Sequence, residues 1–439
     1  MNVRLFPDHW KTDSVSELCT DVVDCVNKTA PVVDGPTEYK MIRTTNVKAG
    51  RINLDDCRYV DEATFVKWTR RIQPKRNDIV LTREAPLGEV GLLRSDESVF
   101  LGQRTMLYRA NPKKLDQRFL YYSMLGPFVQ GQIRSQGSGA TVEHLRVPDA
   151  ESFLVAYPPL EEQRRIAALL SAYDDLIANN QRRIALLESM AEEIYREWFV
   201  RMRFPGAKSA VFVKGVPTDW THEPILNAFK FYGGATPARD NPRFWVDGDV
   251  HWYTPTDITG ASSPYLEESA DKCTDEGLQN CSANLFPAYS IMMTSRATIG
   301  AIGINCAPAC TNQGFITCIP NQRYPLTYLY HWLKLAKPHF EMLSGGATFA
   351  ELTKGTFKRI RILTPPEKLV AAYEQQARPM FEQVELLTKT NRRLRATRDA
   401  LIPRLISGKL RVEALDIQFP PSMQPPPAEA AQRGEAIAS

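Results

Sequence analysis

The chain has 439 residues, of which 43% are hydrophobic and 24% are charged. This composition excludes a wholly disordered chain, a collagen-like fibre and a small disulfide-stapled secreted scaffold, and the length predicts two or three domains. The net charge of +4 at pH 7 neither requires nor excludes nucleic acid, because a sequence-specific binder needs local basic contacts rather than a basic total.

Apolar runs indicate where a protein is located, and the spacing of its cysteines indicates whether they can bind a metal. No apolar run approaches the roughly 20 residues that cross a bilayer, and residues 1–18 contain no apolar signal core, so we expect a cytoplasmic protein. The eight cysteines form no CxxC pair. Cys306, Cys310 and Cys318 could form a metal site, but we expect reduced, buried thiols and no metal.

The chain contains an internal repeat. The segment LTREAPLGEVGL at 81–92 recurs as MTSRATIGAIGI at 293–304, 212 positions later. Further matched segments follow in the same order, which chance does not explain: 42–47 with 253–258, 137–145 with 345–352, 157–163 with 364–369, and 180–188 with 390–398.

Each half changes character once along its length. Short β-type runs and turn residues fill about the first 150 residues, and a Pro-Pro pair then starts a long segment without glycine. The last 22 residues are rich in proline and alanine, which predicts disorder. We therefore expect two globular domains, at 1–157 and 206–364. A long helix follows each of them, at 158–205 and at 365–412, and a disordered tail ends the chain at 413–439.

The two long segments are predicted to be paired helices. Apolar residues recur in alternating steps of four and three, from Ile166 to Trp198 and again from Val370 to Leu405, which is typical of a coiled-coil seam. We expect Pro379 and Pro403 to kink or break the second helix. Helices within a larger core are the alternative, but duplicated helices can bury their seams against each other in antiparallel fashion, with the globular domains at opposite ends. The predicted fold class is therefore α+β: two similar mixed α/β domains joined by two long antiparallel coiled-coil helices, with a pseudo-twofold internal repeat.

The sequence lacks the common catalytic motifs. The chain contains no GxxxxGK[ST], GxSxG or HExxH motif and no glycine-rich methyl-donor loop, and neither Pro-Pro pair follows an Asn or Asp. Catalysis within this chain is not expected. Two similar domains on a rigid spacer suit either a split DNA target or a scaffold for two protein partners.

Polar and basic side chains at predicted turns favour DNA. Arg, Asn and Gln pair with base edges, and glycine-rich turns let backbone amides approach phosphates, although each single residue is more simply a solvated loop residue. The candidate DNA contacts of the first domain are Arg43, Thr44, Thr45, Asn46, Arg83, Gln103, Arg104, Arg134 and Ser138. Those of the second are Thr254, Thr256, Asp257, Arg296, Asn312, Gln313 and Thr348.

Over about residues 1–415 the chain resembles the specificity subunit of a Type I restriction-modification system. The resemblance rests on PPLEEQRRIAALLSAYDDLIANNQRRIALLESMAEEIYREWFV at 158–200, on the second long segment at 365–410, which ends in LISGKL, and on GGATPARDNPRFW at 233–245. The first half departs from this pattern, because it offers only Lys28-Thr29-Ala30-Pro31 in place of Gly-Gly-Ala-Thr-Pro. In the second half, Glu367-Lys368-Leu369 follows Pro-Pro in place of Glu-Glu-Gln.

The resemblance implies a non-catalytic subunit with two target recognition domains, each reading half of a split double-stranded DNA sequence. It implies two methyltransferase subunits that methylate adenine N6 with S-adenosylmethionine, and two ATP-dependent translocase-nuclease subunits, with ATP and Mg²⁺ in those partners and no cofactor in this chain. Charged helix residues are candidates for the methyltransferase dock or simply a solvated face: Arg164, Arg165, Glu188, Glu192 and Glu193. A methyltransferase-only system, a fused nuclease-methyltransferase and a non-DNA scaffold stay open as alternatives.

Overall fold

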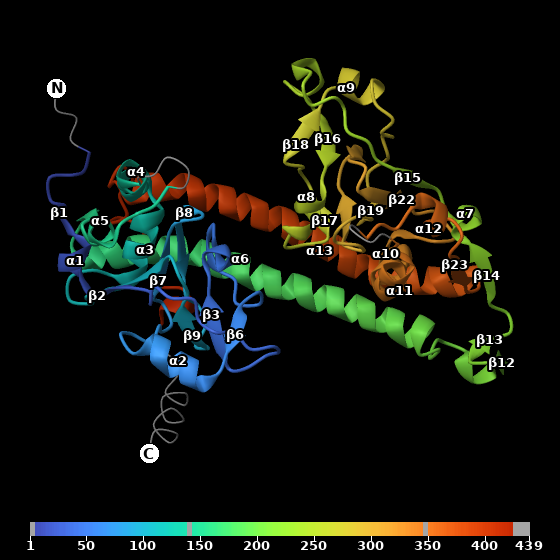
Figure 1. Ribbon diagram of the computed structural model, residues 1–439, viewed down its shortest axis with the longest axis horizontal. Helices are drawn as coiled ribbons and strands as arrows, with labels where there is room; N and C mark the ends of the chain where they lie inside the picture. The colour runs from blue at the N-terminus through green and yellow to red at the C-terminus, as the bar shows by residue number, and fades with distance from the viewer. Residues whose placement is uncertain (1–4, 138–142, 346–349, 425–439) are drawn as a thin grey trace. The chain divides into compact units, whose positions relative to one another are not determined.

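The computed structural model describes residues 5–137, 143–345 and 350–424 (Figure 1). The chain divides into two compact units. Unit 1 comprises residues 1–177 and 394–439, and unit 2 comprises residues 178–393. Each unit therefore contains one globular domain together with part of both long helices.

Unit 1 is built on two main sheets and a short strand pair. A six-stranded sheet has the order β2-β10-β7-β8-β5-β4, and a three-stranded sheet has the order β6-β3-β9. Strand β1 (Lys11–Ser14) pairs with β11 (Leu154–Tyr157) beside them. The other strands are β2 (Cys19–Asp24), β3 (Tyr39–Ile42), β4 (Val47–Lys48), β5 (Gly50–Ile52), β6 (Arg58–Val60), β7 (Ile79–Arg83), β8 (Leu87–Leu92), β9 (Ser98–Leu101) and β10 (Thr105–Ala110). The helices are α1 (Val15–Leu18), α2 (Glu62–Thr69), α3 (Gln117–Leu125), α4 (Pro127–Gln136) and α5 (Val147–Glu151).

Unit 2 repeats this plan with shorter strands. Its five-stranded sheet has the order β15-β22-β19-β20-β17, and its three-stranded sheet has the order β18-β16-β21. The strands are β12 (Phe212–Val213), β13 (Val216–Pro217), β14 (Thr221–Pro224), β15 (Phe231–Gly233), β16 (Val250–Tyr253), β17 (Tyr265–Leu266), β18 (Asp271–Cys273), β19 (Ile291–Thr294), β20 (Ile302–Asn305), β21 (Ala309–Thr311), β22 (Phe315–Cys318) and β23 (Arg361–Thr364). The helices are α7 (Ile225–Ala228), α8 (Pro255–Thr259), α9 (Asp275–Gln279), α10 (Leu326–Leu335), α11 (Lys337–Leu343) and α12 (Lys354–Phe357).

The strand pairings confirm the internal repeat. In unit 1, β3 pairs in parallel with β9 and antiparallel with β6. In unit 2, β16 pairs in parallel with β21 and antiparallel with β18. The hairpins β7-β8 and β19-β20 occupy equivalent places in the larger sheets. Figure 1 shows β16 and β18 extending away from the part of α13 that belongs to unit 2.

The predicted long helices are confirmed as α6 (Leu160–Tyr195) and α13 (Glu367–Leu405). Within unit 2 they pack antiparallel, because the Tyr373 hydroxyl donates to the Ala191 carbonyl over 3.4 Å while Asn180 Nδ2 donates to Asn391 Oδ1 over 3.0 Å. Both asparagines are buried, and this hydrogen bond pairs their amides at the polar step of the seam. The second helix was predicted to kink or break at Pro379 and Pro403, and it breaks at neither, since α13 is continuous through both. Pro379 is exposed, so the carbonyl that it leaves without a helical N–H partner can face water.

A buried ionic network joins the two helices within unit 1. The carboxylate of Asp174 on α6 accepts from Arg398 Nη1 on α13 over 2.5 Å and from Arg94 Nη2 over 2.8 Å. The hydroxyl of Tyr122 donates to the same carboxylate over 2.7 Å. Burial pushes the pKa of Asp174 upward, but the two guanidinium groups and the tyrosine outweigh it and hold the pKa below its ordinary value.

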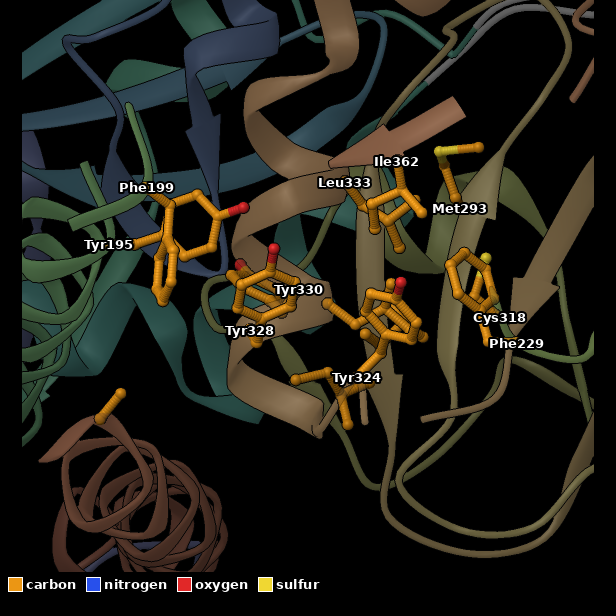
Figure 2. Packing of buried hydrophobic residues seen from close by; sticks show 14 of the residues in the cluster. Tyr195, Phe199, Phe229, Met293, Cys318, Tyr324, Tyr328, Tyr330, Leu333 and Ile362 are labelled. Atoms are coloured by element: carbon orange, nitrogen blue, oxygen red, sulfur yellow. The ribbon is translucent and has the colours of Figure 1, made fainter. Parts of the chain in front are cut away.

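The core of unit 2 is aromatic. Figure 2 shows Tyr195 and Phe199, at the end of the first long helix, beside Tyr328 and Tyr330 of α10. The ring of Tyr328 lies 5.4 Å from that of Tyr195 and 5.0 Å from that of Phe199. These rings hold the end of α6 against the globular domain by apolar burial and edge contacts.

The segment after α13 corrects a prediction. Residues 413–424 were expected to be disordered, yet Arg118 donates to Ser422 Oγ over 2.7 Å and to its carbonyl over 2.6 Å. Arg165 also donates to the carbonyls of Glu413 and Leu415, over 3.0 and 3.2 Å. These bonds satisfy backbone groups that water would otherwise solvate, which composition alone does not reveal. The rest of the predicted tail, residues 425–439, lies outside the described residues.

Candidate nucleic-acid interface

The tight turn between β7 and β8 shares its threonine hydrogen bonds and its positive φ angles with the turn between β19 and β20, although only the first contains a cis peptide bond, Ala85-Pro86. Thr82 Oγ1 donates to the Pro86 carbonyl over 2.6 Å and accepts from the Glu89 N–H over 3.0 Å. At the equivalent place, Thr294 Oγ1 donates to the Thr298 carbonyl and accepts from the Ala301 N–H. Positive φ angles recur as well: +46° at Ala85, +82° at Gly88, +57° at Ala297 and +78° at Gly300.

Backbone hydrogen bonds join each turn to two other segments. In unit 1 the N–H of Arg83 donates to the Arg104 carbonyl over 2.8 Å, and the N–H of Leu145 donates to the Arg83 carbonyl over 2.9 Å. In unit 2 the same bonds run from Ser295 to Gly314 and from Leu352 to Ser295, over 2.8 and 2.9 Å. We call these places the first corner (29, 82–88, 102–104 and 144–145) and the second corner (236, 294–300, 312–314 and 351–352).

A short helical turn lies against each corner. The Gly102 N–H donates to the Ile42 carbonyl over 2.8 Å, which places residues 44–46 beside the first corner. The Asn312 N–H donates to the Tyr253 carbonyl over 3.0 Å, which places α8 beside the second. A polar side chain caps the N-terminus of each helical turn. Asn46 Oδ1 accepts from the Arg43 N–H over 2.8 Å, and Asp257 Oδ2 accepts from the Thr254 N–H over 2.7 Å.

The two corners carry opposite charge at equivalent backbone positions. In the first, Glu84 of the turn lies 3.3 Å from Arg104 and 3.4 Å from His144. In the second, Arg296 of the turn lies 2.9 Å from Glu351, across the corresponding bridge. The two corners therefore share a backbone frame, but the turn residue is acidic in the first and basic in the second, and in each corner it pairs with a side chain of opposite charge.

The second corner opens onto a pocket of about 380 Å³. Arg296 and Gln313 line it together with Lys354 at the start of α12. Gly233 and Gly234 form its wall, and a Cβ atom on Gly234 would lie 2.0 Å from the Asn312 carbonyl oxygen. Glycine is therefore required here to let two backbones approach closely, and the recess is also lined by Glu351, the ion-pair partner of Arg296.

The structure places the predicted DNA contacts in three classes. Two side chains are buried: Asn46 is 2% exposed, and Arg83 is 7% exposed and donates to the Leu145 carbonyl over 3.1 Å. These two residues frame the first corner rather than project from it. Ser138 and Thr348 lie outside the described residues. The exposed candidates are Thr45, Gln103, Arg104, Arg134, Thr256, Arg296 and Gln313, and the half-buried ones are Arg43, Thr44, Thr254, Asp257 and Asn312.

Most of these residues gather at the corners. Thr44 Oγ1 donates to the Ala85 carbonyl over 2.9 Å, so it supports the turn of the first corner. Arg43 donates to the Asp56 carbonyl over 2.7 Å, which holds its guanidinium against a neighbouring loop. Arg134 lies on α4, in a pocket that Arg398 and Asp399 also line.

The sequence reasoning missed Thr29 and Thr236. Thr29 Oγ1 donates to Gln103 Oε1 over 3.2 Å, and Thr236 Oγ1 donates to Gln313 Oε1 over 2.7 Å. This equivalence shows that Lys28-Thr29-Ala30-Pro31 occupies in unit 1 the place of the Gly-Gly-Ala-Thr-Pro segment in unit 2. A threonine followed within two residues by proline was the available signal.

The predicted partner-binding residues of α6 mostly have partners within their own unit. Glu192 lies 2.7 Å from Arg196 and 2.8 Å from Lys334, while Glu193 pairs with Arg201. Glu188 accepts from the Tyr330 hydroxyl over 3.4 Å, and burial raises the pKa of its carboxyl. Arg164 and Glu193 are exposed, whereas Arg165, Glu188 and Glu192 are half-buried.

The cysteines form no disulfide among the described residues. All eight cysteines are free thiols, and Cys310 and Cys318 are buried while Cys306 is half-buried. Across residues 5–137, 143–345 and 350–424, no helix combines the length and the apolar character that a bilayer span requires.

Comparisons with known proteins agree on one family. The family model described as the Type I restriction modification DNA specificity domain matches residues 7–189 and again residues 217–378. Over 371 residues the chain is 24% identical to the Type I restriction enzyme MjaIX specificity subunit of Methanocaldococcus jannaschii, covering 82% of this chain and 83% of that protein. It is 22% identical over 338 residues to the HindI specificity subunit of Haemophilus influenzae, covering 63% of this chain and 73% of that protein.

A solved structure shares the fold. The S subunit of a Type I restriction-modification system from M. genitalium superposes with a TM-score of 0.51 at 17% sequence identity. The superposition covers 92% of this chain and 98% of that one.

Proposed function

The chain belongs to the family of Type I restriction-modification DNA specificity subunits, and we propose on that premise that its two corners contact the two halves of a split DNA target. It is a DNA-recognition subunit and a non-catalytic component of its complex. The duplicated corner carries the proposal, because the family model matches the chain twice and each match contains one corner. Two similar readers in one chain suit two half-sites.

The exposed polar residues of the corners are the proposed contacts. In unit 1 these are Gln103 and Arg104, with Thr45 beside them, and in unit 2 they are Arg296 and Gln313, with Thr256 beside them. Arginine and glutamine donate to base edges or to phosphate oxygens, and a well-made bidentate pair contributes about 1–3 kcal/mol of discrimination. The reversed charge at Glu84 and Arg296 supports two different half-sites rather than a palindrome.

The catalytic activities are assigned to partner subunits. We propose that two methyltransferase subunits bind the helical region and that two translocase-nuclease subunits complete the complex. S-adenosylmethionine, ATP and Mg²⁺ would then serve those partners, and this chain would hold no cofactor. Arg164 and Glu193 are the better candidates for the methyltransferase dock, since both are exposed. The complex would act in the cytoplasm, where its DNA is.

Methylome sequencing tests the proposal. A host strain is compared with and without this chain, while its methyltransferase partner is kept. The expected result is loss of N6-methyladenine at one split motif. An unchanged methylome in an expressing strain would instead favour a scaffold for protein partners.

A domain exchange tests the assignment of half-sites. Residues 206–364 are replaced by the corresponding segment of another specificity subunit, and the methylome is read again. One half-site should change while the other half-site persists. A change in both half-sites would contradict the proposal that each unit reads its own half.

A further inference from the structure

Each corner holds a glutamine whose side-chain oxygen is already engaged. Gln103 Oε1 accepts from Thr29 Oγ1, and Gln313 Oε1 accepts from Thr236 Oγ1. The two threonines are 207 positions apart in sequence, and the two glutamines are 210 positions apart. The same contact therefore occurs in both copies of the repeat, although the residues surrounding it have diverged.

Both glutamines stand on firmly held turns. The turn of Gln103 is closed by the Thr105 hydroxyl, which donates to the Gly102 carbonyl over 2.6 Å. The turn of Gln313 is closed by the Gly314 N–H, which donates to Asn312 Oδ1 over 2.9 Å. Because both glutamine side chains are exposed, the free end of each amide is available to a ligand.

The threonines are held as firmly as the turns. In unit 2, Trp252 Nε1 donates to the Ala235 carbonyl over 2.9 Å, and the Ala235 N–H donates to the Thr311 carbonyl over 2.9 Å. In unit 1, Ala30 is 3% exposed and packs in an apolar cluster beside Thr29. Neither hydroxyl therefore depends on a mobile backbone to reach its glutamine.

This arrangement decides which edge of the amide faces outward. A glutamine side chain has one acceptor oxygen and an NH₂ group with two donors, and an unrestrained amide can turn either way. A threonine hydroxyl that donates to the oxygen directs the NH₂ group away from the corner. The amide oxygen has two lone pairs, so accepting from threonine leaves it one, and the NH₂ group is the part of the amide that faces outward as a donor.

We propose that Thr29 and Thr236 are positioning residues that make Gln103 and Gln313 hydrogen-bond donors to acceptor atoms of the DNA, one in each half-site. The inference rests on the proposed function and names the chemistry that each corner recognises. Acceptors of this kind are guanine O6 and N7, thymine O4 and phosphate oxygens.

The test uses the whole chain in complex with its methyltransferase partner, on the target found by methylome sequencing and on variants of it. Thr236→Val keeps the side-chain volume and removes the hydroxyl, whereas Thr236→Ser keeps the hydroxyl. Thr259→Val is the matched control, because Thr259 is exposed on the same unit and donates only to the Pro255 carbonyl, over 3.1 Å. Gln313→Met removes the donors without adding charge.

Removal of the Thr236 hydroxyl should affect one half-site. Thr236→Val is expected to lower discrimination at one base pair by about two- to tenfold, the equivalent of one hydrogen bond, and Gln313→Met should weaken it at least as much. Thr236→Ser and Thr259→Val should retain it. Thr29→Val and Gln103→Met should act on the other half-site.

The outcomes separate base from phosphate recognition. Loss confined to one base pair identifies a base acceptor. A uniform loss over all sequences, with a smaller salt dependence of binding, identifies a phosphate acceptor. Either result supports Gln313 as a hydrogen-bond donor to the DNA, provided that Thr236→Ser keeps wild-type discrimination and binding.

Other outcomes overturn the inference. Wild-type behaviour of Thr236→Val, alongside a defect in Gln313→Met, would remove the positioning role of the threonine. If Thr236→Val and Gln313→Met both behave like the wild type, Gln313 does not contact the DNA, and the proposed function is unaffected. A wild-type complex without any sequence dependence would instead refute the proposed function itself, and the inference with it.

Discussion

The ionic network around Asp174 yields the sharpest stability prediction. Replacing Asp174 with Asn keeps the size of the side chain and removes its charge. The side chain of Asp174 is 3% exposed and that of Arg398 is 9% exposed, so neither group can be solvated where it stands. The substitution leaves the guanidinium groups of Arg398 and Arg94 opposite a neutral amide.

The magnitude follows from burial. Breaking a buried ion pair by removing one partner destabilises a protein by about 3–5 kcal/mol. Arg94 is 33% exposed, and Arg398 keeps Asp399 at 2.7 Å, so part of the lost interaction is replaced. We therefore expect the lower end, about 3 kcal/mol for unit 1, which corresponds to roughly a 150-fold rise in its opening equilibrium at 1.36 kcal/mol per tenfold.

Hydrogen–deuterium exchange measures the opening equilibrium of unit 1 by itself. A local measurement is needed because a chain of two units need not unfold in one step. Peptides from 166–177 and 394–405 should exchange about 150-fold faster in Asp174→Asn. The matched control is Glu382→Gln on α13, which removes an exposed pair of 3.1 Å with Arg378. An exposed helical pair contributes about 0.3–0.5 kcal/mol, so exchange near it should change about twofold. Equal effects of the two substitutions would refute the argument from burial.

Other contacts within the two units give further predictions. Because the folded pKa of Asp174 is lowered, its stabilisation should be complete at neutral pH and fade as pH falls below about 4, so the wild type and Asp174→Asn should converge in acid-unfolding curves. Asn391→Leu removes the acceptor of the Asn180 amide and should destabilise unit 2 by about 1–3 kcal/mol in denaturant unfolding. Adding Asn180→Leu should recover most of this loss, because no polar group then remains at this step of the seam. Gly126→Ala places a methyl group 1.8 Å from Ile406 Cδ1 and should lower the free energy of unfolding of unit 1 by about 1–3 kcal/mol in denaturant unfolding. Shortening the Ile406 side chain should relieve this clash. Arg118→Met removes both bonds to Ser422, so limited proteolysis should cut 413–424 sooner while α3 stays protected.

Much of the architecture could be predicted because the repeat and the helices are written in local patterns. The match of 81–92 with 293–304 predicts two domains of one plan, and the strand pairings agree. Heptad spacing predicts α6 and α13 because helical periodicity is visible within a few turns. The asparagines at 180 and 391, recognised as polar steps in each seam, contact each other in unit 2.

The candidate site was predicted less completely. Gln103, Arg296 and Gln313 were identified by residue type and position at turns, and they lie exposed at the corners. Arg83 was selected by the same reasoning, but it is buried against the Leu145 carbonyl. Residue type says what a side chain can bind, but not whether folding has already supplied its partner.

The sequence by itself therefore determined the duplication, the long helices and the kind of side chains available for recognition, because each rests on spacing within a short window. The tertiary structure alone decided which of those side chains face outward. It also decided that Thr29 and Thr236 hold the two glutamines, and that Glu84 and Arg296 reverse the charge of equivalent corners. These features depend on hydrogen bonds between segments tens of residues apart, and no local pattern records such contacts.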